Sequence, residues 1–136
     1  MTRIVILGMK HEELTSAIIG ICILIHEKLG PGLLESIYEE VICYEFDKRK
    51  IKYKRQQGIP VLYDHIKMDL GFRADIIVDH KVLLEIKSIQ TLAPVDAKRV
   101  ITYLRFAEIE VGLLINFNVA LLKEGITRLV LDKKEN

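Results

Sequence analysis

The sequence has few aromatic residues, no tryptophan and no dominant sign of charge. Aromatic side chains make up 7% of the 136 residues, which disfavours a surface that stacks single-stranded bases. Lys and Arg total 20 against 19 for Asp and Glu, and the formal charge of +1 excludes a polycation that coats nucleic acid. Any contact with nucleic acid must therefore come from a local patch. The 50% hydrophobic content excludes a disordered chain.

Cysteine is scarce as well, and no hydrophobic run is long. Cys22 and Cys43 form no CxxC pair and no zinc-ligand pattern, so we expect two buried thiols in a reducing compartment. The apolar segments 4–7 and 18–25 are too short to span a membrane, and 4–7 is too short for a signal sequence. These absences predict a soluble cytoplasmic protein with no membrane contact, and the length predicts one domain over 1–136.

Hydrophobic periodicity predicts a mixed α/β or α+β domain around one sheet. Helical spacing of apolar residues indicates helices over 13–29, 33–48 and 94–107. Strands are predicted at 51–56, 59–63, 71–78, 82–88, 111–117 and 127–131, so the order is α-α-β-β-β-β-α-β-β. The first helix is apolar on two sides, which places it in the core or at a subunit interface. The second alternative would make the protein a homodimer.

One pair of predicted strands carries charged residues among apolar ones. Asp75 lies in the strand 71–78, and the next strand carries Glu85 and Lys87, whose side chains share a face because strand residues alternate. Burying such charges costs free energy unless they are paired or bind an ion. Mg²⁺ would satisfy them, because carboxylate oxygens are its preferred protein ligands. An ion-pair network on an exposed sheet face is the competing interpretation.

The turn between these two strands decides whether the two acids can share an ion. A two-residue turn at 79–80 would pair Asp75 with Leu84 and place the acids on opposite faces. A three-residue turn at 79–81 would pair Asp75 with Glu85 on one face. The metal-site interpretation therefore requires an odd turn or a bulge.

Glu35 is a third acid, at the edge of the apolar stripe of the helix 33–48. We expect its carboxylate to face the protein, either towards the other two acids or in a salt bridge with a lysine. Glu39 and Glu40 point away from the stripe, and we expect both to be solvated.

Four motifs follow one another along the chain. They are Gly32-Leu33-Leu34-Glu35-Ser36-Ile37-Tyr38, then Phe72-Arg73-Ala74-Asp75, Glu85-Ile86-Lys87 and Leu114-Ile115-Asn116-Phe117. In this ordered set the chain resembles the GxxExxY protein family, which is assigned to the PD-(D/E)xK nuclease superfamily. The resemblance covers about 14–131 and leaves 1–10 as an N-terminal extension. It implies a restriction-endonuclease-like core in which helices flank a central mixed sheet.

The resemblance also implies an activity. The protein would be a Mg²⁺- or Mn²⁺-dependent nuclease, a hydrolase that cleaves nucleic-acid phosphodiester bonds with a metal-activated water, with DNA favoured over RNA as its partner. Asp75 and Glu85 would bind the metal with the backbone carbonyl of Ile86, Glu35 would complete the site, and Lys87 would be the catalytic lysine. The site is expected in a cleft between the helix 33–48 and the sheet.

The helix 94–107 departs from the pattern of the family. Arg99 stands where relatives carry a Gln four residues before Tyr103, and Asp96 stands where they often carry His. Arg99 would either bind a phosphate or pair with the acids in place of a metal. This departure keeps open an alternative function: a non-catalytic module on a nuclease fold that binds nucleic acid or a protein partner.

Five residues are candidate substrate contacts. They are Arg99, Tyr103, Arg73, Lys52 and Lys54. In the basic segment 48–55, alternate lysines share one face of the predicted strand and would contact phosphates. The competing interpretation is an edge strand that its lysines protect against aggregation.

Overall fold

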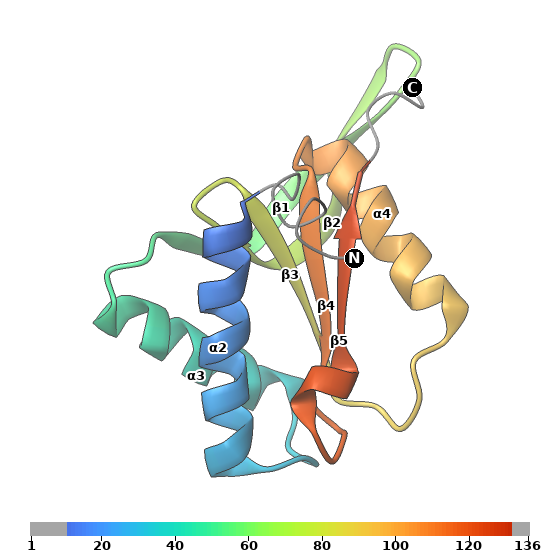
Figure 1. Cartoon of the computed structure of the whole chain (residues 1–136). Coiled ribbons are helices and arrows are strands. Elements are labelled where there is room, and N and C mark those ends of the chain that lie inside the picture. The colour runs from blue at the N-terminus through green and yellow to red at the C-terminus, as the bar shows by residue number, and fades with distance from the viewer. Residues whose placement is uncertain (1–10, 132–136) are drawn as a thin grey trace.

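The computed structural model describes residues 11–131 and shows a five-stranded sheet with helices on both faces (Figure 1). The predicted N-terminal extension and the apolar segment 4–7 lie outside the described residues. Along the chain the elements are α2 (Glu12–Leu29), α3 (Glu35–Lys48), β1 (Tyr53–Tyr63), β2 (Ile66–Val78), β3 (Val82–Lys87), α4 (Pro94–Ala107), β4 (Val111–Asn116), the 3-10 helix η1 (Leu122–Gly125) and β5 (Ile126–Val130).

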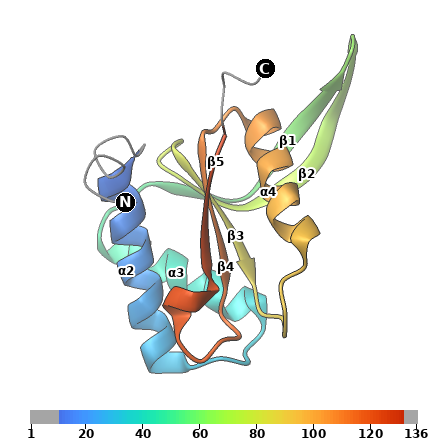
Figure 2. The same ribbon diagram turned by 45° about the vertical axis from the view of Figure 1, so that its right-hand side comes forward.

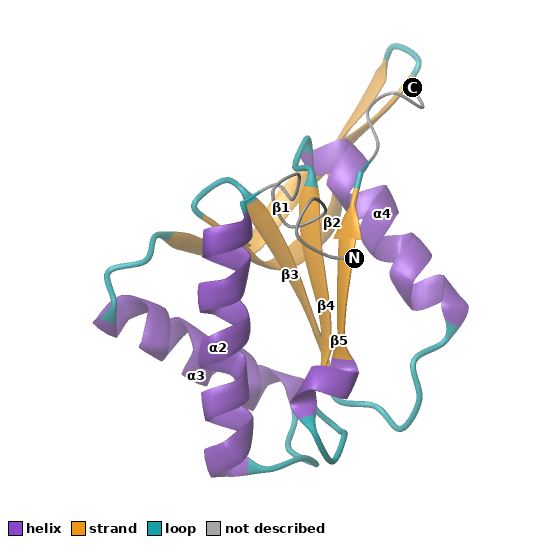
Figure 3. Ribbon diagram, viewed as in Figure 1, coloured by secondary structure: helices purple, strands orange, loops and turns teal. Residues whose placement is uncertain are grey.

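The sheet is mixed, as the sequence predicted. Its strand order is β1-β2-β3-β4-β5, with β3 and β4 parallel and the other neighbours antiparallel (Figure 3). The order of helices and strands follows the prediction, except that the two strands expected at 51–56 and 59–63 are one continuous strand, β1. That strand is irregular at Gln56, where φ is 48°, and its register with β2 shifts between Ile59 and Val61. The β1–β2 hairpin extends well beyond the other strands (Figure 2).

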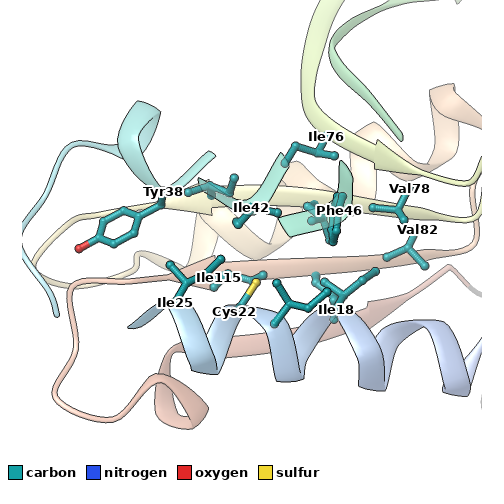
Figure 4. Close-up of a cluster of buried hydrophobic side chains, with 14 of the residues drawn as sticks. Ile18, Cys22, Ile25, Tyr38, Ile42, Phe46, Ile76, Val78, Val82 and Ile115 are labelled. Atoms are coloured by element: carbon teal, nitrogen blue, oxygen red, sulfur yellow. The ribbon is translucent and has the colours of Figure 1, made fainter. Parts of the chain in front are cut away.

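Helices α2 and α3 cover one face of the sheet, and α4 covers the other (Figures 1 and 2). The larger apolar cluster lies under α2 and α3, where Ile18, Cys22 and Ile25 of α2 meet strand residues such as Val82 (Figure 4). The second apolar strip of α2, which includes Ile19 and Ile23, is partly buried against the same cluster. The two-sided character of α2 therefore serves the core of the chain itself, and the homodimer stays a prediction.

The two cysteines and the membrane question were also addressed by the sequence. Cys22 and Cys43 are buried free thiols, as expected, and burial raises the pKa of Cys22 to about 12. Among the described helices, none combines the length and the apolar character needed to cross a membrane.

Candidate metal centre

The turn between β2 and β3 has the three residues, 79–81, that the shared-face interpretation requires. Val78 pairs with Val82 and Ile76 pairs with Leu84, and this register, continued by one residue beyond the paired positions, would place Asp75 opposite Glu85. The Asp75 carboxylate also reaches β3 directly, because its Oδ2 accepts the N–H of Ile86 at 2.8 Å. The structure thus brings Asp75 and Glu85 together on neighbouring strands.

Asp75 lies where the regular alternation of β2 breaks down. Ala74 packs in the cluster under α4, whereas Ile76 packs in the cluster under α2 and α3. Two residues so spaced share a face in a regular strand. On β1, Gln56 has a left-handed backbone. Arg55 pairs with Ile76 and Gln57 pairs with Ala74, but Gln56 and Asp75 between them are not paired. At this irregularity the Asp75 side chain reaches the β3 backbone, where its Oδ2 accepts the Ile86 N–H.

Glu85 is a buried acid, with 8% of its surface exposed. Its Oε1 has no hydrogen-bond partner among the described residues. Burial, with a smaller contribution from the nearby charge of Asp75, raises the pKa of Glu85 to about 8 against the opposing charge of Lys87. Burial also raises the pKa of Asp75, against the effect of the Ile86 N–H. An unpartnered carboxylate oxygen is costly to bury, and a bound cation would remove that cost.

The groups at this point suit a hard divalent cation. The N–H and C=O of one strand residue point the same way, so the Ile86 carbonyl lies on the side of Asp75. Within 11–131, no three His, Cys, Asp or Glu side chains converge as a metal-binding group. Mg²⁺ does not need such a group, because it is usually held by one or two carboxylates and keeps several waters. Asp75, Glu85 and the Ile86 carbonyl therefore form a fitting ligand set.

Glu35 approaches the same region from the first turn of α3. Its Oε2 accepts the N–H of Ser88 at 3.2 Å, and Ser88 Oγ donates to the Leu33 carbonyl at 2.6 Å. These bonds tie the start of α3 to the end of β3. Glu35 as a whole is an exposed residue, but its carboxylate faces the protein, as expected. Its charge raises the pKa values of both Asp75 and Glu85.

A hollow of about 510 Å³ lies beside this junction. Its walls come from the start of α3, the end of β3 and the loop after β4, and Glu35 and Ser88 are part of them. Asp75, Glu85 and Lys87 are not among its lining residues, so the cleft expected between this helix and the sheet stays a prediction.

Tyr38, the last residue of the first motif, has a structural role. Its hydroxyl donates to the Gly30 carbonyl at 2.6 Å and accepts the Leu33 N–H at 3.2 Å. Its ring stacks on Phe117 with centroids 4.2 Å apart, at the end of the core cluster (Figure 4). Gly32 has φ 98°, a conformation that favours glycine. The motif thus shapes the turn that delivers Glu35.

Helix α4 brings Arg99 and Tyr103 near Glu85. Asp96 accepts the Ala93 N–H at 2.7 Å, which caps α4, and its other oxygen pairs with Arg99 Nη1 at 3.2 Å. Arg99 therefore pairs on its own helix, although its charge still lowers the pKa of Glu85. Tyr103 stacks on Phe72 with centroids 4.0 Å apart. Burial raises the pKa of Tyr103, with a further contribution from Glu85.

The remaining substrate-contact candidates are spread along the β1–β2 hairpin. Arg73 is exposed on β2, opposite Gly58 of β1. Lys52 and Lys54 line a separate hollow beside the Asp79–His80 turn. The structure does not bring these two lysines into the acidic cluster. β1 is an edge strand, as the aggregation-protection alternative requires.

The sequence analysis did not identify Glu39 and Gln56, two residues that lie close to Asp75. The prediction that Glu39 is solvated is wrong, because it is 7% exposed and accepts hydrogen bonds from Arg55 Nε at 3.1 Å and Gln56 Nε2 at 3.0 Å. The same Gln56 amide donates to Asp75 Oδ1 at 3.4 Å. The one available signal was that Glu39 lies four residues after Glu35, on the same side of the helix.

A family model described as the PD-(D/E)XK nuclease superfamily matches residues 12–129. The matched segment begins in α2, ends in β5 and contains Asp75, Glu85 and Lys87. No match was found among curated proteins or among solved structures.

Proposed function

The chain belongs to the PD-(D/E)XK nuclease superfamily, and on this premise we propose that it is a Mg²⁺- or Mn²⁺-dependent nuclease of the GxxExxY family. Nucleases of this superfamily generally use divalent metals. The observation that carries the proposal is the buried Glu85 oxygen, which has no partner in the described part of the chain, on a residue whose pKa the nearby charge of Asp75 raises. A site that leaves one carboxylate oxygen unsatisfied is suited to a cation.

In this proposal Asp75, Glu85 and the Ile86 carbonyl hold the cation. When bound, the cation would supply Lewis-acid activation of water and of the scissile phosphate. Lys87 follows Glu85 by two residues and lies on the same side of β3. Its ammonium would stabilise the negative charge that develops on the phosphate oxygens. Glu35 completes the site, and its bond to the Ser88 N–H holds α3 at the end of β3.

The proposed substrate is nucleic acid, with DNA favoured over RNA. Arg99 and Tyr103 on α4 and Arg73 on β2 would contact it near the acids, and Lys52 and Lys54 would contact it farther along the hairpin. A homodimer would allow two such centres to act on the two strands of a duplex. A cytoplasmic location belongs to the same proposal.

One observation favours a second candidate function. Arg99 is paired with Asp96, and the described residues offer two acids plus Glu35 without a converging group of three. A chain with this arrangement could serve as a non-catalytic module that binds nucleic acid or a protein partner.

Calorimetry and a cleavage panel separate the two candidates. We expect wild type to bind Mn²⁺, Asp75→Ala to lose the binding heat, and cleavage of single-stranded, double-stranded or branched substrates to require the metal. Lys87→Ala should keep the binding heat and lose activity by about 100-fold. Lys81→Ala is the matched control, because the Lys81 ammonium pairs with Asp79 of the turn, and this variant should cleave normally. Wild type without metal-dependent heat would contradict the nuclease proposal.

A further inference from the structure

We propose that Gln56 is a positioning residue, whose side-chain amide ties the Asp75 carboxylate to the buried Glu39 of α3. The inference rests on the proposed nuclease function, because its purpose is to hold one proposed metal ligand in place. Gln56 belongs to none of the four motifs that carried the resemblance.

The hydrogen bonds of Gln56 leave one orientation for its amide. Nε2 donates to Glu39 Oε1 at 3.0 Å and, at the longer distance of 3.4 Å, to Asp75 Oδ1. Both partners are carboxylates, which accept hydrogen bonds when ionised. The amide nitrogen carries two protons and can serve both acids, whereas the amide oxygen can serve neither.

The backbone of Gln56 is what makes this bridge geometrically available. Consecutive strand residues point to opposite faces, yet Arg55 and Gln56 both reach Glu39. The cause is the left-handed conformation of Gln56, with φ 48°. Such a conformation costs free energy for a residue with a Cβ, and it persists where surrounding contacts impose it. Here it turns the amide towards the acids.

The far end of the bridge is anchored. Glu39 is 7% exposed, and its second oxygen accepts Arg55 Nε at 3.1 Å. Arg55 is itself held by Glu40, whose Oε1 accepts Nη1 at 2.9 Å. Helix α3 therefore supplies a fixed acceptor for the Gln56 amide.

At the near end, both Asp75 oxygens are engaged. Oδ1 accepts the Gln56 amide, and Oδ2 accepts the Ile86 N–H at 2.8 Å. Two donors from different strands define the plane of the carboxylate before any cation arrives. Partners that orient a metal ligand in this way typically change metal affinity by about 10- to 100-fold when they are removed.

The test compares variants at two neighbouring glutamines. Gln56→Ala removes the amide at the same strained backbone, and Gln56→Gly removes it while relieving the strain, so Gln56→Gly is the variant to use if Gln56→Ala folds poorly. Gln57→Ala is the matched control, because Gln57 lines a different hollow with Lys54 and His80.

Two measurements are made on each protein. The first is Mn²⁺ affinity by calorimetry, which should fall by about 10- to 100-fold in both Gln56 variants and stay unchanged in Gln57→Ala. The second is hydrogen exchange of the Ile86 amide by NMR without metal. The Ile86 exchange rate should rise in the Gln56 variants, because the Asp75 carboxylate that accepts this N–H is no longer held by the Gln56 amide. The exchange rate of the core amide of Leu113 should not change.

The outcomes distinguish this inference from the proposed function. Wild type that binds no Mn²⁺ overturns the nuclease proposal, and the inference about metal positioning with it. If wild type binds Mn²⁺ and the Gln56 variants bind it equally well with unchanged Ile86 exchange, Gln56 does not position Asp75 and the nuclease proposal stands.

Discussion

Asn116 holds the backbone of Ile89 through both ends of its side-chain amide. Its Oδ1 accepts the Ile89 N–H at 3.1 Å, and its Nδ2 donates to the Ile89 carbonyl at 3.0 Å. Asn116 also pairs with Lys87 across the parallel strands β3 and β4 and is 3% exposed. This contact fixes the chain just after Lys87 and Ser88, so it holds the end of β3 at the candidate site.

Asn116→Asp should therefore destabilise the protein. A carboxylate cannot donate to the Ile89 carbonyl, and its charge would be buried, so we expect the free energy of unfolding to fall by about 2–3 kcal/mol. Urea denaturation followed by circular dichroism measures this change. Asn118→Asp, at a half-buried position two residues on, is the control and should lose less. Equal losses in the two variants would show that the Ile89 contact is unimportant.

The stability of the metal-free protein should fall as the pH rises. The pKa of Glu85 is raised from 4.5 to about 8 by burial and by the charge of Asp75. Between these values the folded state binds a proton that the unfolded state has released, so ionisation favours unfolding. Across the pH range from 4.5 to about 8, the free energy of unfolding should fall by at most about 5 kcal/mol.

Melting temperatures from pH 5 to pH 9, recorded with a chelator present, test this dependence. Glu85→Gln removes the titrating group and should be more stable than wild type at the upper end, with a flatter profile. Glu124→Gln, at an exposed position, should follow wild type. Parallel profiles for wild type and Glu85→Gln would refute the assignment. Added Mn²⁺ should stabilise wild type more at high pH, where Glu85 is ionised.

Gly112 allows α4 to pack closely on β4. A Cβ added there would lie 3.0 Å from Val100 Cγ1 and 3.2 Å from Leu104 Cδ2. We expect Gly112→Ala to lower the free energy of unfolding by about 1–3 kcal/mol through overpacking. Gly20→Ala is the matched control, because open space surrounds Gly20 on α2. That change should instead stabilise the helix by about 0.5–1 kcal/mol. Thermal denaturation compares the two variants. A lower melting temperature in both would show that overpacking against α4 is not what destabilises Gly112→Ala.

Elements with strong local signals were predictable from the sequence. The helix 94–107 has the predicted bounds because Pro94 favours the first helical position and Asp96 accepts the Ala93 N–H. The local sequence between β2 and β3 was compatible with a turn of two or three residues, and the structure has the three-residue turn. The sequence predicted two strands, 51–56 and 59–63, with a gap at Gln57 and Gly58, whereas pairing with β2 makes β1 one strand across this gap.

The sequence by itself determined the mixed fold, the order of its elements and the adjacency of Asp75 and Glu85 once the turn is odd. Only the tertiary structure decided that Glu39 is buried and that Gln56 reaches Asp75. The physical reason is that both depend on a break in strand alternation at Gln56, where β1 pairs with β2 and its side chains reach Glu39 of α3. Periodicity describes one element at a time, and such a break is visible only when three elements are placed together.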